Sequence, residues 1–334
     1  MTVRLSVLDL SPVPSGSSAA QAVANTLDLA RHAESIGLHR YWLAEHHNAA
    51  SIASSAPEIM IAAVAAATKS IRVGSGGVML PNHSPLKVAE CFRVLGALYP
   101  DRIDLGVGRA AGTDTKTALA LRQARELLGA EAFPEQLDEL MTYLTSDPDP
   151  ASAFGPIKAV PTGVPAPPLF VLGSGLEGAA LAARLGVGFA FAHHIAPEGY
   201  ASAMRAYREA FRPSRWSSSP YAILATSVLC GADDAAAEDL ERCAALGWLR
   251  FGQGLRDLPT PSIEEARAYR FDPDEEVLRR SARDRHIAGG PERVADMLLQ
   301  MADASGADEI MAMTNIHDHA ERKRSYDRVA RAID

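Results

Sequence analysis

The sequence has few cysteines, no excess of basic residues and no long apolar run. Its three cysteines, Cys91, Cys230 and Cys243, are far apart and form no C-x-x-C pair, which is typical of reduced thiols in a cytosolic protein. The net charge of −8 argues against nucleic acid or an anionic membrane as the main partner. The longest wholly apolar run, residues 59–67, is too short to cross a bilayer. The first residues read as a strand and lack signal-peptide anatomy, so we expect a cytoplasmic protein.

What the sequence does contain is a regular alternation of short β-rich runs and helical patterns. The predicted strands are residues 5–9, 40–44, 71–78, 103–107, 169–172, 188–191, 222–229 and 309–312. Strands that alternate with helices form either a doubly wound sheet or a closed barrel. Eight repeats favour an α/β fold of the (β/α)8 TIM barrel type, and we expect residues 1–334 to form one domain.

Two connections between the predicted strands are too long to be simple loops. Residues 112–168, after the fourth strand, contain two helical runs and a proline-rich passage, and residues 230–290, after the seventh, contain another helix and a polar stretch. Both insertions leave the carboxyl ends of strands, where the active sites of TIM barrels lie. We therefore predict that they build walls or lids over a pocket.

Histidines concentrate at the predicted strand ends. Seven of the ten follow strands directly, namely His46, His47, His83, His193, His194, His317 and His319. Histidines gathered at the carboxyl ends of the strands are compatible with two kinds of site. One is the zinc site of a metal-dependent barrel hydrolase, and the other is a binding site for a large planar cofactor. The first strand ends without histidine and no H-E-x-x-H motif occurs, so the metal reading is the weaker one and no metal ligands are assigned.

The stretch LGSGLEGAALAARLG contains G-x-G-x-x-G at Gly173, Gly175 and Gly178. A dinucleotide fold places this loop after its first strand and an acidic residue after the second, whereas here four strand–helix units precede it and the next strand ends in histidines. Glycines before a helix N-terminus still suit a phosphate, at Ser174, Gly175 and Gly178. The alternative is a tight strand-to-helix turn without a ligand.

Two further features suit a flat, phosphorylated cofactor. The pair Gly76–Gly77 in mid-strand would let a planar ring lie against the backbone, and Arg109 at a strand end offers a planar fork of donors to a phosphate. The simpler readings are a β-bulge for the glycines and a surface ion pair for Arg109.

Several motifs together resemble those of the bacterial-luciferase-like flavin monooxygenases, in the single-subunit, homodimeric branch. They are YWLAEHHN, IRVGSGGVMLPNHSPLKVAE, YPDRIDLGVGRAAGTD, LGSGLEGAALAARLG and DHAERKRSYDRVA, and they occur in family order over nearly the whole chain. The resemblance implies a TIM barrel that binds reduced FMN and uses O2. It also implies that His46 is the catalytic histidine and that Gly76–Gly77 is a non-proline cis peptide under the flavin. Arg109 and the loop Ser174–Gly178 would then bind the phosphate.

The same resemblance implies a monooxygenase that acts through a flavin C4a-hydroperoxide. Hydroxylation, epoxidation and Baeyer–Villiger insertion on a small organic molecule, such as a secondary metabolite, all stay open. A separate NAD(P)H-dependent flavin reductase would supply the reduced FMN, because the glycine loop fails as a dinucleotide site. Two alternatives remain: an F420-dependent hydride-transfer enzyme of the same superfamily, and a metal-dependent TIM-barrel hydrolase.

Overall fold

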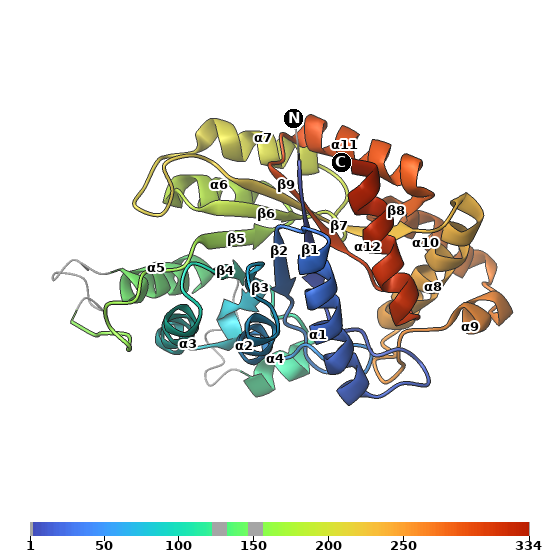
Figure 1. Cartoon of the computed structure of the whole chain (residues 1–334), viewed down its shortest axis with the longest axis horizontal. Helices are drawn as coiled ribbons and strands as arrows, with labels where there is room; N and C mark the ends of the chain where they lie inside the picture. The colour runs from blue at the N-terminus through green and yellow to red at the C-terminus, as the bar shows by residue number, and fades with distance from the viewer. Residues whose placement is uncertain (1–2, 122–131, 146–155, 334) are drawn as a thin grey trace.

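Eight parallel strands form a closed barrel at the centre of the molecule, with helices around it (Figure 1). The computed structural model describes residues 3–121, 132–145 and 156–333. The strands of the ring, in order, are β1 Arg4–Asp9, β2 Arg40–Leu43, β3 Arg72–Met79, β4 Ile103–Gly108, β5 Leu169–Gly173, β6 Gly188–Ala192, β7 Ala222–Cys230 and β9 Glu309–Met313. Strand β1 pairs with both β2 and β9, and β7 pairs with both β6 and β9, so the ring closes. The predicted (β/α)8 TIM barrel is confirmed.

All eight predicted strands are present, and their boundaries agree with the structure within one residue. The helices are α1 Ala19–Ser35, α2 Pro57–Ala67, α3 Pro85–Leu98, α4 Thr115–Leu121, α5 Phe133–Leu144, α6 Leu176–Leu185, α7 Tyr200–Ala210, α8 Asp234–Gly252, α9 Ile263–Ala268, α10 Pro273–Ala282, α11 Pro291–Ser305 and α12 His319–Ile333. Helices α1 and α12, from opposite ends of the chain, lie side by side (Figure 1). Within the described ranges, no helix is both long and apolar enough to span a bilayer.

Of the two predicted insertions, the second differs from expectation in its content. The first holds α4 and α5, the two helices expected, although residues 122–131 and 146–155 of this insertion lie outside the described part. The second holds three helices instead of one, α8, α9 and α10, and an additional short strand, β8 His286–Gly289. Strand β8 pairs with the end of β7 beyond the point where the pairing with β6 stops, so it extends the barrel wall at the carboxyl end. The segment His-Ile-Ala-Gly contains one β-branched residue and so does not form a β-rich run in the sequence.

Side chains alternate between two apolar layers along the strands. Trp42, Phe170 and Met311 belong to the cluster inside the barrel, whereas their neighbours Tyr41 and Ile310 pack between the strands and the helices. Strands buried on both faces need apolar residues at consecutive positions, which explains the unbroken β-rich runs of the sequence. The alternation also determines which residues near a strand end face the interior.

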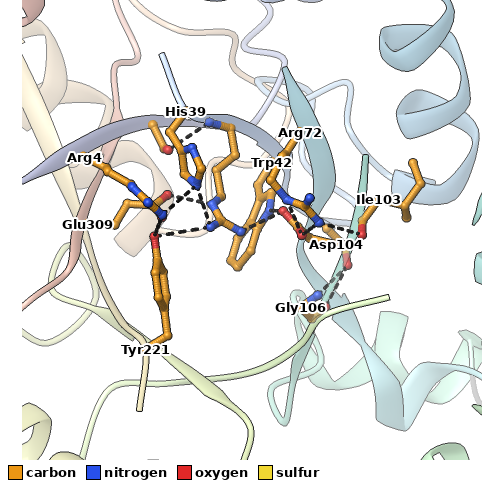
Figure 2. Close-up of polar contacts among 12 residues, drawn as sticks. Arg4, His39, Trp42, Arg72, Ile103, Asp104, Gly106, Tyr221 and Glu309 are labelled. Carbon is orange, nitrogen blue, oxygen red and sulfur yellow. Dashed lines mark hydrogen bonds and ion pairs between the residues drawn. The ribbon is translucent and has the colours of Figure 1, made fainter. Parts of the chain in front are cut away.

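A buried polar network closes the amino-terminal end of the barrel (Figure 2). The Arg40 guanidinium lies 2.8 Å from Asp104 and 2.9 Å from Glu309, and Arg72 lies 2.6 Å from the other Asp104 oxygen. The Trp42 indole N–H donates to Asp104 at 3.1 Å. The carboxylates are fully buried, so their charges depend on these partners. With this end filled by salt bridges, the carboxyl end is the side on which a ligand could enter.

Candidate active site

The predicted site residues lie at one end of the barrel. His46 follows β2, Gly76 and Gly77 belong to β3, Arg109 follows β4, and the loop Ser174–Gly178 joins β5 to α6. The carboxyl ends of the strands in a parallel barrel share one rim, so the fold brings these residues to the same face. Two surface hollows, of about 520 and 310 Å3, lie at the opposite end and are lined by none of these residues.

A buried carboxylate organises the histidines that follow β2 and β3. Glu45 accepts hydrogen bonds from His47 Nε2 at 2.8 Å, from His83 Nε2 at 2.9 Å and from the Met79 N–H at 2.8 Å. Burial alone would raise the pKa of Glu45, but these hydrogen bonds and the charge of His83 hold it below its ordinary value of 4.5. Burial alone would lower the pKa of His83, yet Glu45 raises it above 6.5. His47 and His83 are therefore hydrogen-bond partners of Glu45, and together the three residues connect the segments that follow β2 and β3.

His46 differs from His47 and His83 because its ring nitrogen Nδ1 has no hydrogen-bond partner among the described residues. Its backbone N–H donates to the Ser54 carbonyl at 3.0 Å, while its Nδ1 is buried and has no hydrogen-bond partner among the described residues. It lies two positions beyond Ala44, a member of the interior cluster. Burial lowers the pKa of His46 to about 4, so the imidazole is neutral at pH 7. A neutral imidazole with a free nitrogen can exchange or share a proton with a ligand.

The two histidines after β6 point to different places. His193 packs outside the barrel, where its Nδ1 lies 3.0 Å from Thr226 Oγ1 and its ring meets Tyr200 edge-on. His194 Nδ1 lies 3.2 Å from the Ala225 carbonyl, and burial lowers the pKa of His194 to about 4, with a further contribution from His46. Only His194 therefore shares the site with His46.

Two other rim histidines do not belong to the site. His317 Nε2 lies 2.9 Å from the Ser15 carbonyl, and His319, on α12, forms an ion pair with Asp28 at 2.9 Å. In contrast, His286 in the second insertion, which no strand-end argument selected, reaches β7 at the carboxyl end, where its Nδ1 lies 2.9 Å from Ser227 Oγ. A long-range pairing of this kind leaves no local signal in the sequence.

The peptide bond between Gly76 and Gly77 is cis, as the family resemblance implied. The pairing of β3 with β4 also shifts register between Gly76 and Val78, so the simpler reading of a β-bulge is correct as well. A Cβ on Gly76 would lie 2.7 Å from Leu8 Cδ1, and one on Gly77 would lie 2.8 Å from the Gly106 carbonyl oxygen. Gly77 is thus required by contact with backbone, whereas a side chain at Gly76 would need Leu8 and Trp42 to shift.

Arg109 and the glycine loop meet at the start of α6. The Arg109 guanidinium lies 2.7 Å from the carboxylate of Glu177 in the first turn of this helix, and both side chains are more than half exposed. Gly175 is the N-cap residue and provides no side-chain cap to the first-turn N–H groups. The surface ion pair considered for Arg109 is present, and it places a cation beside an uncapped helix N-terminus, where an anion is stabilised.

The structure explains why glycine is present at some positions of the G-x-G-x-x-G motif, but the explanation differs among the three. A Cβ on Gly173 or on Gly178 would lie 3.3 Å from the Cα of the other, so this pair is explained by a tight strand-to-helix turn. A Cβ on Gly175 would meet nothing within 4 Å. The packing within the chain therefore accounts for two of the glycines and leaves Gly175 facing open space beside the exposed Ser174.

The connections after β2, β4 and β7 are tied together above the site. The His47 N–H donates to the Gly112 carbonyl at 3.2 Å, and Asn48 Nδ2 donates to Asp114 at 3.1 Å. The Ala50 N–H donates to the carbonyl of Arg256 in the second insertion at 2.8 Å. Both insertions therefore contact the connection after β2 at the carboxyl end of the barrel.

Among the described residues, no three His, Cys, Asp or Glu side chains are arranged to hold a metal ion. A barrel with neutral imidazoles, a glycine pair and an arginine at one rim is the arrangement of a barrel enzyme that works on a bound organic group.

Comparisons with known proteins agree with this class. The luciferase-like monooxygenase family matches residues 3–309, and the chain belongs to that family. A luciferase-like monooxygenase of Escherichia coli strain K12 is 40% identical over 328 residues, which cover 98% of this chain and 96% of that protein. The N-acetyl-S-alkylcysteine monooxygenase of Bacillus subtilis strain 168 is 35% identical over 337 residues, covering 99% and 98%. The crystal structure of apo-MsnO8 has a TM-score of 0.91 and 41% identity, covering 99% and 98%.

These relatives support a monooxygenase activity for the chain. More distant structures share only the fold. One is an FMN complex of the oxygenating constituent of 3,6-diketocamphane monooxygenase from Pseudomonas putida, with 20% identity and a TM-score of 0.70, and another is an F420-dependent secondary alcohol dehydrogenase, with 16% and 0.65. The fold alone is thus compatible with either flavin.

Proposed function

We propose that this chain is a monooxygenase that depends on reduced FMN and O2 and oxygenates a small organic molecule. The observation that carries the proposal is the neutral His46, whose buried Nδ1 has no partner among the described residues, at the carboxyl end of a luciferase-like barrel. Buried polar atoms in folded proteins nearly always have a partner, so an orphaned nitrogen here indicates a place for a ligand. Hydroxylation, epoxidation and Baeyer–Villiger insertion are the candidate reactions.

The residues present fit a flavin mononucleotide. Arg109 and the uncapped first turn of α6, at Ser174, Gly175 and Gly178, would hold the phosphate through a planar cation and backbone N–H groups. Gly76 and Gly77 would leave the backbone of β3 free of side chains beside the ring. When bound, reduced FMN supplies the electrons with which O2 is activated for oxygen transfer.

The chain's own residues would position groups and manage protons. His46 is neutral at pH 7, so its Nδ1 can donate or accept one hydrogen bond at the reacting edge without placing a charge there. Glu45 keeps the neighbouring His47 and His83 bound to itself, which leaves His46 as the histidine available after β2. The hydrogen bonds that tie the connections after β2, β4 and β7 would exclude water, which protects a reactive oxidant from unproductive decay.

The electrons would come from a separate NAD(P)H-dependent flavin reductase. The glycine loop follows β5 and stands beside Arg109, as a mononucleotide phosphate site would. The test is to supply NADPH and FMN to the purified chain with no reductase present. We expect no rapid NADPH oxidation until a flavin reductase is added. Rapid oxidation by this chain alone would contradict the two-component scheme.

The cofactor and substrate can be tested in one design. Reduced FMN and reduced F420 are each offered under air with a panel of organic substrates that begins with N-acetyl-S-methylcysteine, because one relative is named for that class. We expect product formation coupled to O2 uptake with reduced FMN only. Substrate turnover that needs reduced F420 and no O2 would replace the proposal with hydride transfer.

We also propose that the chain is a homodimer that pairs through α2 and α3. Ile59 on α2 is 67% exposed, and Val94 and Leu98 on α3 are 46% and 59% exposed, on two helices that pack together. Large apolar side chains exposed on adjoining helices are typical of a partner surface. We expect a dimer by sedimentation at micromolar concentration and a monomer for Leu98→Lys. The matched control is Val277→Lys, at a 65% exposed position on α10. A monomeric native chain would contradict the proposal.

A further inference from the structure

His286 faces the interior of the barrel from a strand outside the ring. It begins β8 and is the register partner of Ser227 in β7. Ile223 and Ala225 belong to the interior cluster, and Ser227 continues the same alternation toward the carboxyl end. The side-chain contact of 2.9 Å between His286 Nδ1 and Ser227 Oγ shows that His286 lies on this inner side as well.

The second nitrogen of His286 is buried without a partner. Its Nε2 makes no hydrogen bond with any described residue. The hydroxyl of Ser227 is also buried, and among the described residues His286 Nδ1 is its one available acceptor. A buried hydroxyl proton needs an acceptor, so Ser227 donates to Nδ1. The proton of the neutral imidazole then resides on Nε2, which makes Nε2–H a buried donor that no described residue accepts.

A second orphaned atom lies on the other side of Ser227. Met313 of β9 is the register partner of Ser227 on the opposite edge, and Asn315, two residues further on, has a buried Oδ1 without a partner among the described residues. Two unsatisfied polar atoms therefore flank the end of β7, beside the apolar side chains of Met311 and Ala225. Such a surface suits an organic molecule that is largely apolar and carries few polar groups.

We propose that His286 is a substrate-binding residue whose Nε2–H, oriented by Ser227, donates a hydrogen bond to the carbonyl oxygen of the organic substrate. The inference rests on the proposed function for the reaction, but the subsite itself needs no flavin. A neutral carbonyl is preferred over a carboxylate because the imidazole is uncharged, since burial lowers the pKa of His286 to about 4, and because the surroundings are apolar.

The test uses two ring compounds of nearly equal shape, cyclohexanone and methylenecyclohexane, of which only the ketone has an oxygen acceptor. Dissociation constants are measured by ligand-observed NMR on the full chain without flavin. We expect the ratio of the two constants to favour the ketone in the native protein and in His286→Gln, whose amide keeps an N–H near the position of Nε2. In His286→Leu the ratio should fall about two- to tenfold, the loss of one hydrogen bond between neutral groups.

An unchanged ratio in His286→Leu, or no binding of either probe to the native chain, would overturn the proposal. A second readout needs no ligand. In the nitrogen-15 spectrum of histidine-labelled protein, His286 should show the Nε2–H tautomer, and Ser227→Ala should change the tautomer ratio, whereas an Nδ1–H form in the native chain would refute the assignment. Thermal unfolding checks that each variant folds. A parallel FMN titration separates the two hypotheses, because failure to bind FMN would contradict the proposed function and leave the ketone preference intact.

Discussion

The guanidinium of Arg109 and the carboxylate of Glu177 lie 2.7 Å apart and join the end of β4 to the first turn of α6. The pair is mostly exposed, so it contributes little to stability. Its position is more informative than its strength, because Glu177 belongs to the uncapped first turn of α6 and so holds the Arg109 cation beside that helix N-terminus. For Arg109 to bind a phosphate at this position, the phosphate must replace the Glu177 carboxylate as the partner of the guanidinium.

Arg109→Ala should weaken the binding of FMN by about tenfold or more, since a hydrogen bond to a charged group contributes about 1.5–3 kcal/mol. Affinity for riboflavin, which lacks the phosphate, should not change. The matched control is Arg184→Ala, which removes an exposed arginine from the last turn of the same helix. Equal losses of FMN affinity in the two variants would show that only net charge matters. The measurement is quenching of flavin fluorescence at low ionic strength.

Glu177→Gln should have the opposite effect and tighten FMN binding by about two- to fivefold, the range expected for removing an exposed charge interaction. The gain should shrink as salt is added, because exposed charges are screened. Riboflavin again serves as the ligand control. Weaker FMN binding in this variant would mean that Glu177 helps to form the phosphate site, and the exchange would be wrong.

His46→Ala should reduce product formation by about 10²–10⁴-fold, the usual contribution of a positioned proton-transfer group. Binding of reduced FMN and the thermal midpoint should stay close to native, because His46 makes one backbone hydrogen bond that alanine retains. His46→Asn, whose amide can imitate Nδ1, should recover part of the loss. Product per flavin oxidised, and hydrogen peroxide formed, are the quantities to measure. Native coupling in His46→Ala would remove the catalytic role.

The Glu45–His83 pair predicts a pH-dependent stability. The pKa of His83 is raised by folding, so its stabilisation is complete below its ordinary value of 6.5 and is lost as the pH rises through the raised value. The pKa of Glu45 is lowered, so its contribution is present above 4.5 and is lost as the pH falls through the lowered value. The pair should therefore stabilise most near pH 6.

The variant that isolates this charge is His83→Gln, which keeps a donor for Glu45 and cannot become positive. The difference in thermal midpoint between the native chain and His83→Gln should be largest near pH 6 and should become small by pH 9. A difference that stays constant from pH 6 to pH 9 would show that His83 is neutral in the folded protein at both pH values.

Local patterns of the sequence were sufficient to predict the barrel. Each strand is a short apolar run bounded by turn residues, and these signals depend on neighbours in the chain, so the strand boundaries agree within one residue. The rule that barrel sites lie at the carboxyl ends placed His46 and Arg109 among the strand-end candidates, and the family resemblance singled out His46 as the catalytic histidine. The cis bond at Gly76–Gly77 was predicted through the family resemblance and is present.

Tertiary structure alone decided which polar groups meet. Glu45 and His83 are 38 positions apart, and Ser227 and His286 are 59 apart, so their contacts depend on strand register and leave no periodic signal. The same register separates His194, which is close enough to His46 for a charge interaction, from His193, which packs outside the barrel, although the two are adjacent in sequence. Propensity and periodicity act over a few residues, whereas a hydrogen bond between distant strands exists only after the ring has closed. The roles of the histidines other than His46 therefore could not be distinguished from the sequence.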